Sequence, residues 1–226
     1  MTAPTKPTAQ ARLLRSVAIV FGARGYHAAR VSDIVAQAGL AQGTFYLHFD
    51  SKEAIFLNLI DDFFGGLLNE TLGRFPADDM ADLAELAAQF REMWITIVES
   101  CRRERVLTSL ELREARAIGP ETRIRVDDWY SKAAGVIDSY LRTATERGLL
   151  PEGKSDETAW ALLGFTERAI HYACEINTGI SSDALADELP AFELSGLLGD
   201  WSGTQDTPRR RETSGRTGAD PSGRDP

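Results

Sequence analysis

Residues 31–55, VSDIVAQAGLAQGTFYLHFDSKEAI, contain two short helical patterns joined by a tight turn. The first pattern covers roughly 31–38 and the second roughly 42–49. Gly39 closes the first helix, because glycine readily takes the left-handed conformation in which many helices end. Two short helices joined by a tight turn with a glycine form a helix-turn-helix, whose second helix enters the major groove of DNA. The segment therefore predicts a DNA-binding unit.

The outward face of the second helix carries side chains suited to DNA. At about 100° per residue, Phe45 and Phe49 fall together on one side of this helix, and we expect them in the core. The opposite face offers groups that can pair with base edges, donate to phosphate or touch a thymine methyl. We expect DNA contacts from this face and from residues beside it: Arg30, Ser32, Gln42, Gly43, Thr44, Tyr46, Leu47, His48 and Lys52.

Charge is distributed unevenly along the chain, whose formal net charge is -9 at pH 7. Residues 1–52 hold six basic and two acidic side chains, whereas residues 53–201 hold 14 basic and 28 acidic ones. A basic end on an acidic body is typical of a protein that touches phosphates with that end alone.

The N-terminal part resembles the TetR family of bacterial repressors over about residues 10–56. The resemblance implies a three-helix DNA-binding domain, an all-helical ligand domain and a homodimer on a palindromic operator. It also implies DNA contacts at Gln42, Thr44, Tyr46, His48 and Lys52. The matching residues are Phe21, Gly25, Tyr26, Asp33-Ile34, Ala38-Gly39, Gly43-Thr44-Phe45-Tyr46, His48-Phe49 and Ser51-Lys52-Glu53.

Position 30 departs from the family's pattern. The family often has threonine there, as the cap of the second helix, and this sequence has Arg30. Either Ser32 caps a shorter helix, or the cap is lost and Arg30 reaches phosphate; we favour the phosphate contact. Lys52 lies in the first turn of the next helix and is also expected to meet phosphate.

Helical patterns continue beyond the motif, and no sustained apolar alternation indicates a sheet. We therefore expect an all-α fold with an N-terminal three-helix DNA-binding domain, residues 10–54, and a C-terminal ligand-binding and dimerisation domain, residues 55–201. Residues 1–9 and 202–226 are polar and are predicted to be disordered. Further helices are expected at about 51–75, 79–100, 103–117, 121–148, 155–177 and 182–200.

Aromatic residues of the body are the candidates for a ligand pocket. At helical spacing such residues are more often core, but in this architecture the core surrounds a pocket. With a few polar groups, the predicted lining is Phe90, Trp94, Glu111, Trp129, Tyr130, Phe165, His171 and Tyr172.

The segment 159–176 is apolar nearly all round, and a helix of that kind is covered on more than one side. Together with the leucine-rich segment 185–201 it predicts a dimer interface made of two helices from each subunit. A large monomeric core is the alternative. Pro190 suggests a kink or a late start in the last helix. The predicted interface residues are Leu162, Phe165, Ala169, Ala173, Phe192, Leu197 and Trp201.

Other classes of protein receive little support. There is no apolar run long enough for a membrane span and no apolar signal segment, so we expect a cytoplasmic protein with no membrane partner. Cys101 and Cys174 are expected to be reduced, buried thiols, with redox sensing as the alternative. No Cys/His spacing suggests zinc, and we expect no metal and no cofactor.

The sequence predicts a ligand-responsive repressor that binds an operator as a homodimer and is released by a small-molecule effector. The chain is not expected to be an enzyme, because no nucleophile–base pair or phosphate loop appears. A DNA-binding activator, a ligand-independent regulator and, more distantly, a small all-α enzyme remain alternatives. The identity of the effector is not encoded in any motif.

Overall fold

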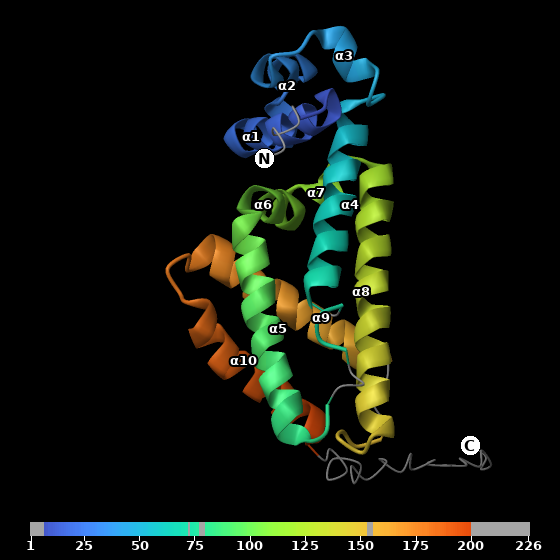
Figure 1. Ribbon diagram of the computed structural model, residues 1–226, viewed down its shortest axis with the longest axis vertical. Helices are drawn as coiled ribbons and strands as arrows, with labels where there is room; N and C mark the ends of the chain where they lie inside the picture. Colours follow the sequence, from blue (N-terminus) through green and yellow to red (C-terminus); the bar gives the residue numbers. More distant parts are fainter. Residues whose placement is uncertain (1–6, 72, 77–79, 153–155, 200–226) are drawn as a thin grey trace, which may run out of the picture.

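The computed structural model describes residues 7–71, 73–76, 80–152 and 156–199, and within these ranges every regular element is helical. Three helices form one end of the molecule: α1 (Ala9–Ala28), α2 (Val31–Ala38) and α3 (Gln42–Tyr46). Helix α4 (Lys52–Thr71) leads from them into the body (Figure 1). The all-α fold with an N-terminal helix-turn-helix is confirmed.

The body is built around three long helices that run side by side, α4, α5 and α8, with α9 crossing behind them in Figure 1. Helix α10 packs along α5, α9 packs along α8, and α6 lies against α1. The elements of the body after α4 are α5 (Leu83–Arg103), α6 (Arg105–Arg113), α7 (Ala115–Ile118), α8 (Pro120–Glu146), α9 (Asp156–His171), a π-helical turn (Tyr172–Ile176) and α10 (Ser182–Leu198).

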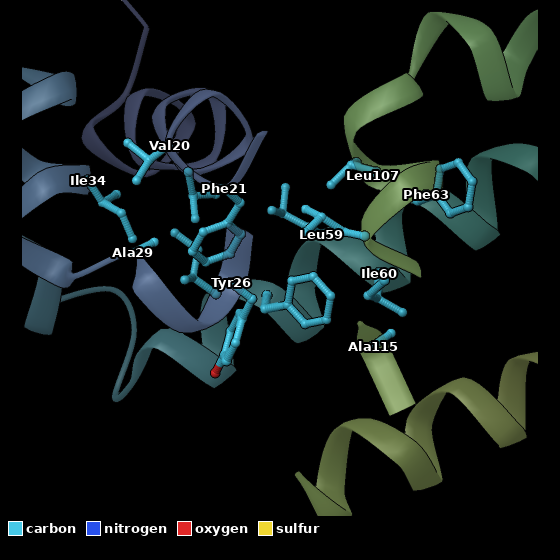
Figure 2. Close-up of a cluster of buried hydrophobic side chains, with 14 of the residues drawn as sticks. Val20, Phe21, Tyr26, Ala29, Ile34, Leu59, Ile60, Phe63, Leu107 and Ala115 are labelled. Atoms are coloured by element: carbon cyan, nitrogen blue, oxygen red, sulfur yellow. The ribbon is translucent and has the colours of Figure 1, made fainter. Parts of the chain in front are cut away.

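One apolar core runs from the three-helix end into the body. It includes Phe21 and Ile34 at that end, Ile60 on α4, and Leu107 and Ala115 on α6 and α7. Figure 2 shows these side chains converging between the two parts of the molecule. The predicted division at residue 54 falls within the first turn of α4 and stays a prediction, because the apolar core crosses it.

Side-chain caps fix several helix starts. The Thr8 hydroxyl accepts from the N–H of Ala11, and the Asp82 carboxylate accepts from two N–H groups of α5 at 2.9 Å. Ser51 caps α4, since its Oγ accepts from the Ala54 N–H at 2.9 Å. Each cap satisfies N–H groups that have no partner within the helix.

Three predicted helices differ from the observed ones. Helix α3 ends at Tyr46 rather than near residue 49, because the N–H groups of His48 and Phe49 both bond to the Phe45 carbonyl in a turn that returns Phe49 to the core. The helix expected at 103–117 breaks at Glu114, whose φ of -122° lies outside the helical range.

The remaining differences lie near the C-terminal end. The helix expected at 155–177 changes to π geometry at Tyr172. Helix α10 begins at Ser182 and continues through the buried Pro190, so the late start suggested by that proline is wrong. Residues 1–6 and 202–226, which the sequence predicted to be disordered, lie outside the described ranges, whereas Ala9 already belongs to α1.

Candidate DNA-binding face and ligand cavity

The turn of the helix-turn-helix is held from behind by α1. The Arg12 guanidinium donates to the carbonyl oxygens of Ala38 and Gly39 at the end of α2. Gly39 has φ 63° and ψ 41°, the left-handed conformation expected for it, and the N–H of Leu40 bonds back to Val35 at 2.9 Å. Arg12 therefore acts inside the domain, and its charge helps to set the angle between α2 and α3.

The face of α3 divides as the helical wheel requires. Phe45 and Phe49 are buried, with 0% and 7% of their surface exposed, and their ring centroids lie 5.9 Å apart. Leu47 is 82% exposed, a position with no packing role in this chain. Thr44 is half-buried. The other predicted contact residues of this face are exposed: Gln42, Gly43, Tyr46 and His48.

The start of α2 decides between the alternatives for Arg30. Arg30 occupies the N-cap position and gives no side-chain cap, while the exposed Ser32 lies inside the helix and does not cap it. Instead Asp33 reaches back and accepts from the backbone N–H of Arg30 at 3.0 Å. Asp33 also pairs with Arg24 at 3.2 Å. Arg30 is exposed, which leaves it available to phosphate.

Lys52, for which a phosphate contact is expected, makes several contacts within the chain. Its ammonium donates to the carbonyl oxygens of Tyr26 at 2.7 Å, Ala29 at 2.9 Å and His27 at 3.5 Å. It also lies 4.2 Å from the centroid of the Tyr26 ring. Partial burial lowers the pKa of Lys52. An ammonium has three donors, and the short hydrogen bonds to Tyr26 and Ala29 join α4 to the end of α1.

Two glutamates join the helix-turn-helix end to the body. Glu114, at the break between α6 and α7, accepts from the backbone N–H of Tyr26 at 3.0 Å. Glu53, on α4, accepts from the backbone N–H and hydroxyl of Thr122 in the first turn of α8, at 3.3 and 2.7 Å. Gly25, next to Tyr26, has φ 74°, and a Cβ there would lie 3.2 Å from Glu114. The positive φ and the close approach of the Glu114 carboxylate therefore both favour glycine at position 25.

The body encloses a cavity of about 160 Å³. Its lining reaches from Tyr130 to Leu141 on α8 and from Phe90 to Cys101 on α5. Eleven residues of helix extend about 16 Å, so the cavity is elongated along the helices. Its wall is mainly apolar and aromatic, with contributions from α4, α5, α6, α8, α9 and α10.

Four of the eight predicted pocket residues line this cavity: Phe90, Trp94, Glu111 and Tyr130. The other four do not. Trp129 stacks on the outer side of Phe64 at 5.8 Å and donates to Asp61. The other three lie toward the C-terminal helices: Phe165 packs between Trp94 and Phe192, Tyr172 is 40% exposed, and His171 is half-buried outside the lining.

Two buried glutamates are the main polar groups of the cavity wall. Glu111 is 7% exposed and accepts from the Tyr130 hydroxyl at 3.1 Å. Glu193 is 8% exposed and accepts from the Trp94 indole N–H at 2.8 Å. Burial raises the pKa of each carboxyl to about 7. Each therefore titrates near neutral pH.

Several lining residues were absent from the sequence prediction, most clearly Phe63, Phe64, Tyr140 and Glu193. Phe63 and Phe64 follow the motif on α4, and neighbouring aromatic residues gave no signal of which one faces a cavity. Glu193 had a usable signal: it is an acidic residue between the apolar Phe192 and Leu194, on a helix otherwise rich in apolar side chains.

The predicted dimer residues differ in how far they are exposed in the single chain. Ala173 and Leu197 are 0% and 2% exposed and pack within the subunit. Leu162 lines the cavity. Phe165 and Ala169 are half-buried, and Phe192 is 68% exposed. Trp201 lies outside the described residues.

The exposed apolar surface of α9 and α10 was missed in part. Trp160 on α9 is 43% exposed and Leu198 on α10 is 42% exposed, and the same two helices carry the stack of Phe165 on Phe192, whose ring centroids lie 5.3 Å apart. We call Trp160, Phe165, Phe192 and Leu198 the aromatic face. Helical spacing alone did not separate its members from the buried residues of the same helices.

The two cysteines are buried, and burial raises the pKa of the Cys101 thiol to about 12. Within the described ranges, no three His, Cys, Asp or Glu side chains are grouped to hold a metal ion. No helix in the same ranges is long and apolar enough to cross a membrane.

The three-helix end matches the model of the bacterial regulatory proteins of the tetR family over residues 13–59. Residues 13–59 therefore form a TetR-family N-terminal domain. Among curated relatives, the uncharacterised HTH-type transcriptional regulator YdgC of Bacillus subtilis (strain 168) is 58% identical over 52 residues, which are 23% of this chain and 27% of that one. The fatty acid metabolism regulator protein of the same strain is 28% identical over 140 residues, 59% of this chain and 66% of that one.

The matched regions thus span less than two thirds of either relative. Over the whole fold, the chain is similar to the transcriptional regulator FadR from Bacillus subtilis in complex with stearoyl-CoA, with a TM-score of 0.71 and 20% sequence identity. The superposition covers 82% of this chain and 98% of FadR. The helical body therefore shares its fold with the body of that protein.

Proposed function

We propose that the protein is a ligand-responsive transcriptional repressor that binds a palindromic operator as a homodimer. A small molecule in the cavity of the body releases it from DNA. The observation that carries this proposal is the face of α3, where an exposed leucine, Leu47, lies among exposed glutamine, glycine and histidine side chains on a scaffold fixed from behind by Arg12.

An exposed leucine costs free energy in water, and contact with a thymine methyl would remove that cost. Gln42 at the first position of α3 suits a bidentate contact with an adenine edge. Arg30 and the hydroxyl of Tyr46 suit phosphate. Lys52 contributes indirectly, because it positions α4 against the end of α1 and so sets the orientation of the helix-turn-helix.

The aromatic face supports a homodimer. Trp160, Phe192 and Leu198 are large apolar side chains exposed on α9 and α10 of the single chain, and exposed apolar surface of this kind often marks an interaction site. A two-fold contact through α9 and α10 would cover both copies together and fix the spacing of the two α3 helices.

The cavity and the two junction glutamates support release by a ligand. Glu111 in the cavity wall lies three residues before Glu114, which holds the backbone of Tyr26. A ligand that shifts α6 at Glu111 therefore moves the contact on α1 directly. Couplings of this kind amount to about 1–3 kcal/mol, or roughly 5–150-fold in affinity. Fatty acid metabolism, named for one relative, gives one class of apolar compound to test.

The test is binding of the full chain to DNA fragments from around its own gene, with footprinting of the bound region. We expect a protected inverted repeat and an affinity that falls by about 0.9 log units per log unit of salt for each phosphate neutralised. Gln42→Ala should relax the preference at one base pair in each half-site, at a cost of about 1–3 kcal/mol. A footprint without a dyad, or an affinity unaffected by salt, contradicts the proposal.

A further inference from the structure

The lining of the cavity selects among classes of ligand. We propose that the cavity binds an apolar molecule that carries a protonated amine, with Glu193 and Glu111 as the groups that recognise the charge. The inference rests on the proposed function, since it names the chemical class of the effector that would occupy the same cavity.

Glu193 presents a free carboxylate oxygen to the cavity. One oxygen, Oε2, accepts from the Trp94 indole N–H at 2.8 Å. The other, Oε1, has no hydrogen bond to any described residue, although the side chain is 8% exposed. Every fully buried side-chain oxygen of the described residues has a hydrogen-bond partner, so Oε1, which has none, retains some accessible surface. Glu193 is a lining residue of the cavity. This oxygen is therefore positioned to accept from a ligand.

Glu111 repeats the arrangement elsewhere in the wall. Its Oε1 accepts from the Tyr130 hydroxyl at 3.1 Å, and its Oε2 has no hydrogen-bond partner among the described residues. The Arg116 guanidinium lies 4.7 Å from the Tyr130 ring and partly offsets the charge of Glu111. Described residues provide no comparable cation for Glu193, so Glu193 is the stronger candidate for the ligand's counter-ion.

The charged side chains that line the cavity are all acidic. Its acidic side chains are Glu111, Glu167 and Glu193, and no described lining residue is lysine, arginine or histidine. Arg91, on α5, is directed to Asp183 and Asp187 at 2.8 and 2.9 Å and is not part of the wall. A ligand with a buried carboxylate or phosphate would meet acidic groups without a compensating cation.

An ammonium group complements the acidic side chains of the cavity wall. It donates charge-assisted hydrogen bonds to carboxylate oxygens, and both glutamates of the wall have an oxygen that accepts no hydrogen bond from a described residue. Burial raises the pKa of both carboxyls to about 7, because the side chains of this chain only partly compensate the buried charges. A bound cation would restore the ionised form of each.

The experiment is calorimetric titration of the full chain with three probes of one length: octylamine, octanoate and 1-octanol. At pH 8 we expect octylamine to bind at least tenfold more tightly than either of the others. Glu193→Gln keeps the shape and the acceptor for Trp94, and it should abolish that preference while leaving 1-octanol binding unchanged. Glu188→Gln is the matched control, because Glu188 is exposed on the same helix.

The pH dependence provides a second readout that does not require a variant. The groups that face the two carboxyls are Trp94 for Glu193, and Tyr130, Glu167 and Arg116 for Glu111. Octylamine affinity should rise between pH 6 and pH 8 as the carboxyls ionise. Octanoate affinity would fall over the same interval, because a protonated carboxyl can donate to it.

The outcomes separate this inference from the proposed function. If octanoate binds best and releases DNA while octylamine does neither, the inference is overturned and the ligand-responsive repressor stands. Equal binding of all three probes, or binding of none, also overturns it. If Glu193→Gln fails to fold, the inference is still tested by the affinities of the unmodified chain for the three probes and by the change of those affinities with pH.

Discussion

The backbone N–H of Tyr26, at the end of α1, donates to Oε2 of Glu114 at 3.0 Å, although 88 residues separate them in the sequence. Glu114 is also where the helix of residues 105–118 breaks, one turn from Glu111 in the cavity wall. The cavity and the helix-turn-helix end are thus joined through a single turn of backbone.

The first prediction concerns this junction. Glu114→Ala removes the acceptor of the Tyr26 N–H and should reduce the ligand-induced loss of DNA affinity by about fivefold or more, within the usual range of couplings. Ligand binding to the cavity should stay within about twofold, because Glu114 is not in its wall. The measurement is DNA affinity with and without ligand.

Glu104→Ala is the control for the junction, since Glu104 is exposed at the other end of α6. If Glu114→Ala responded to ligand like the unmodified chain, the route through α6 would be wrong.

The second prediction assigns Lys52 to stability. Lys52→Ala should lower the free energy of unfolding by about 1–3 kcal/mol, because it removes charge-assisted hydrogen bonds to Tyr26 and Ala29 and leaves their carbonyls without a donor. DNA affinity should fall equally for all sequences. Arg15→Ala removes the same charge from an exposed site of the same domain and should leave stability nearly unchanged. Equal stability of the two variants in urea would contradict this role.

The third prediction uses Gly43. A Cβ at this position would meet no atom within 4 Å, and its φ is not positive. Gly43→Ala should therefore stabilise α3 slightly, by up to about 1 kcal/mol. If α3 approaches DNA through this position, operator affinity should nevertheless fall at least tenfold. A variant that is both stable and fully active in DNA binding would place Gly43 away from the groove.

The difference between prediction and structure follows from what each feature depends on. Local rules sufficed for the turn at Gly39, the inward Phe45 and Phe49 and the outward Leu47, because backbone conformation and helical spacing act over a few residues. The acceptors of Lys52 lie 23 to 26 residues away, and nothing in the local pattern showed that the end of α1 would come within reach of its ammonium.

The cavity shows the same limit. Helical spacing identified Trp94 and Tyr130 as inward residues, but Trp129 beside Tyr130 faces Phe64 instead. The direction of a side chain on α8 depends on which of its neighbours, α4, α7 or α9, covers each side. One sequence contains no information on those contacts beyond the apolar pattern, which is satisfied by either tryptophan or tyrosine.

The fourth prediction concerns pH. Burial raises the pKa of Glu193 from 4.5 to about 7, so the folded chain holds a proton that the unfolded chain releases between those values. The stability contributed by this proton is fully present below pH 4.5 and is lost as pH rises toward 7. Relative to Glu193→Gln, the unmodified chain should lose about 2–3 kcal/mol of unfolding free energy between pH 4.5 and pH 8. Parallel profiles for both proteins in urea would show that folding does not raise the pKa of Glu193.

The last prediction concerns assembly through the aromatic face. Phe192 is 68% exposed and stacks on Phe165 at 5.3 Å, so its outer side is free in the single chain. In a two-fold interface made by α9 and α10, Phe192→Glu would place two carboxylates near each other and should yield a monomer by light scattering at micromolar concentration. Operator affinity should then fall at least tenfold, because the second half-site no longer contributes.

Two variants control for this interpretation. Ile124→Glu adds the same charge at an apolar residue of α8 that is 60% exposed, and it should leave assembly unchanged. Leu197→Glu places a charge at a residue that is 2% exposed within the chain, so it should unfold the subunit rather than separate two folded subunits. Circular dichroism distinguishes these results, because Phe192→Glu keeps its helical signal and Leu197→Glu loses it. A Phe192→Glu protein that remains dimeric would exclude the aromatic face as the interface and would direct attention to the other exposed apolar side chains, Ile124 among them.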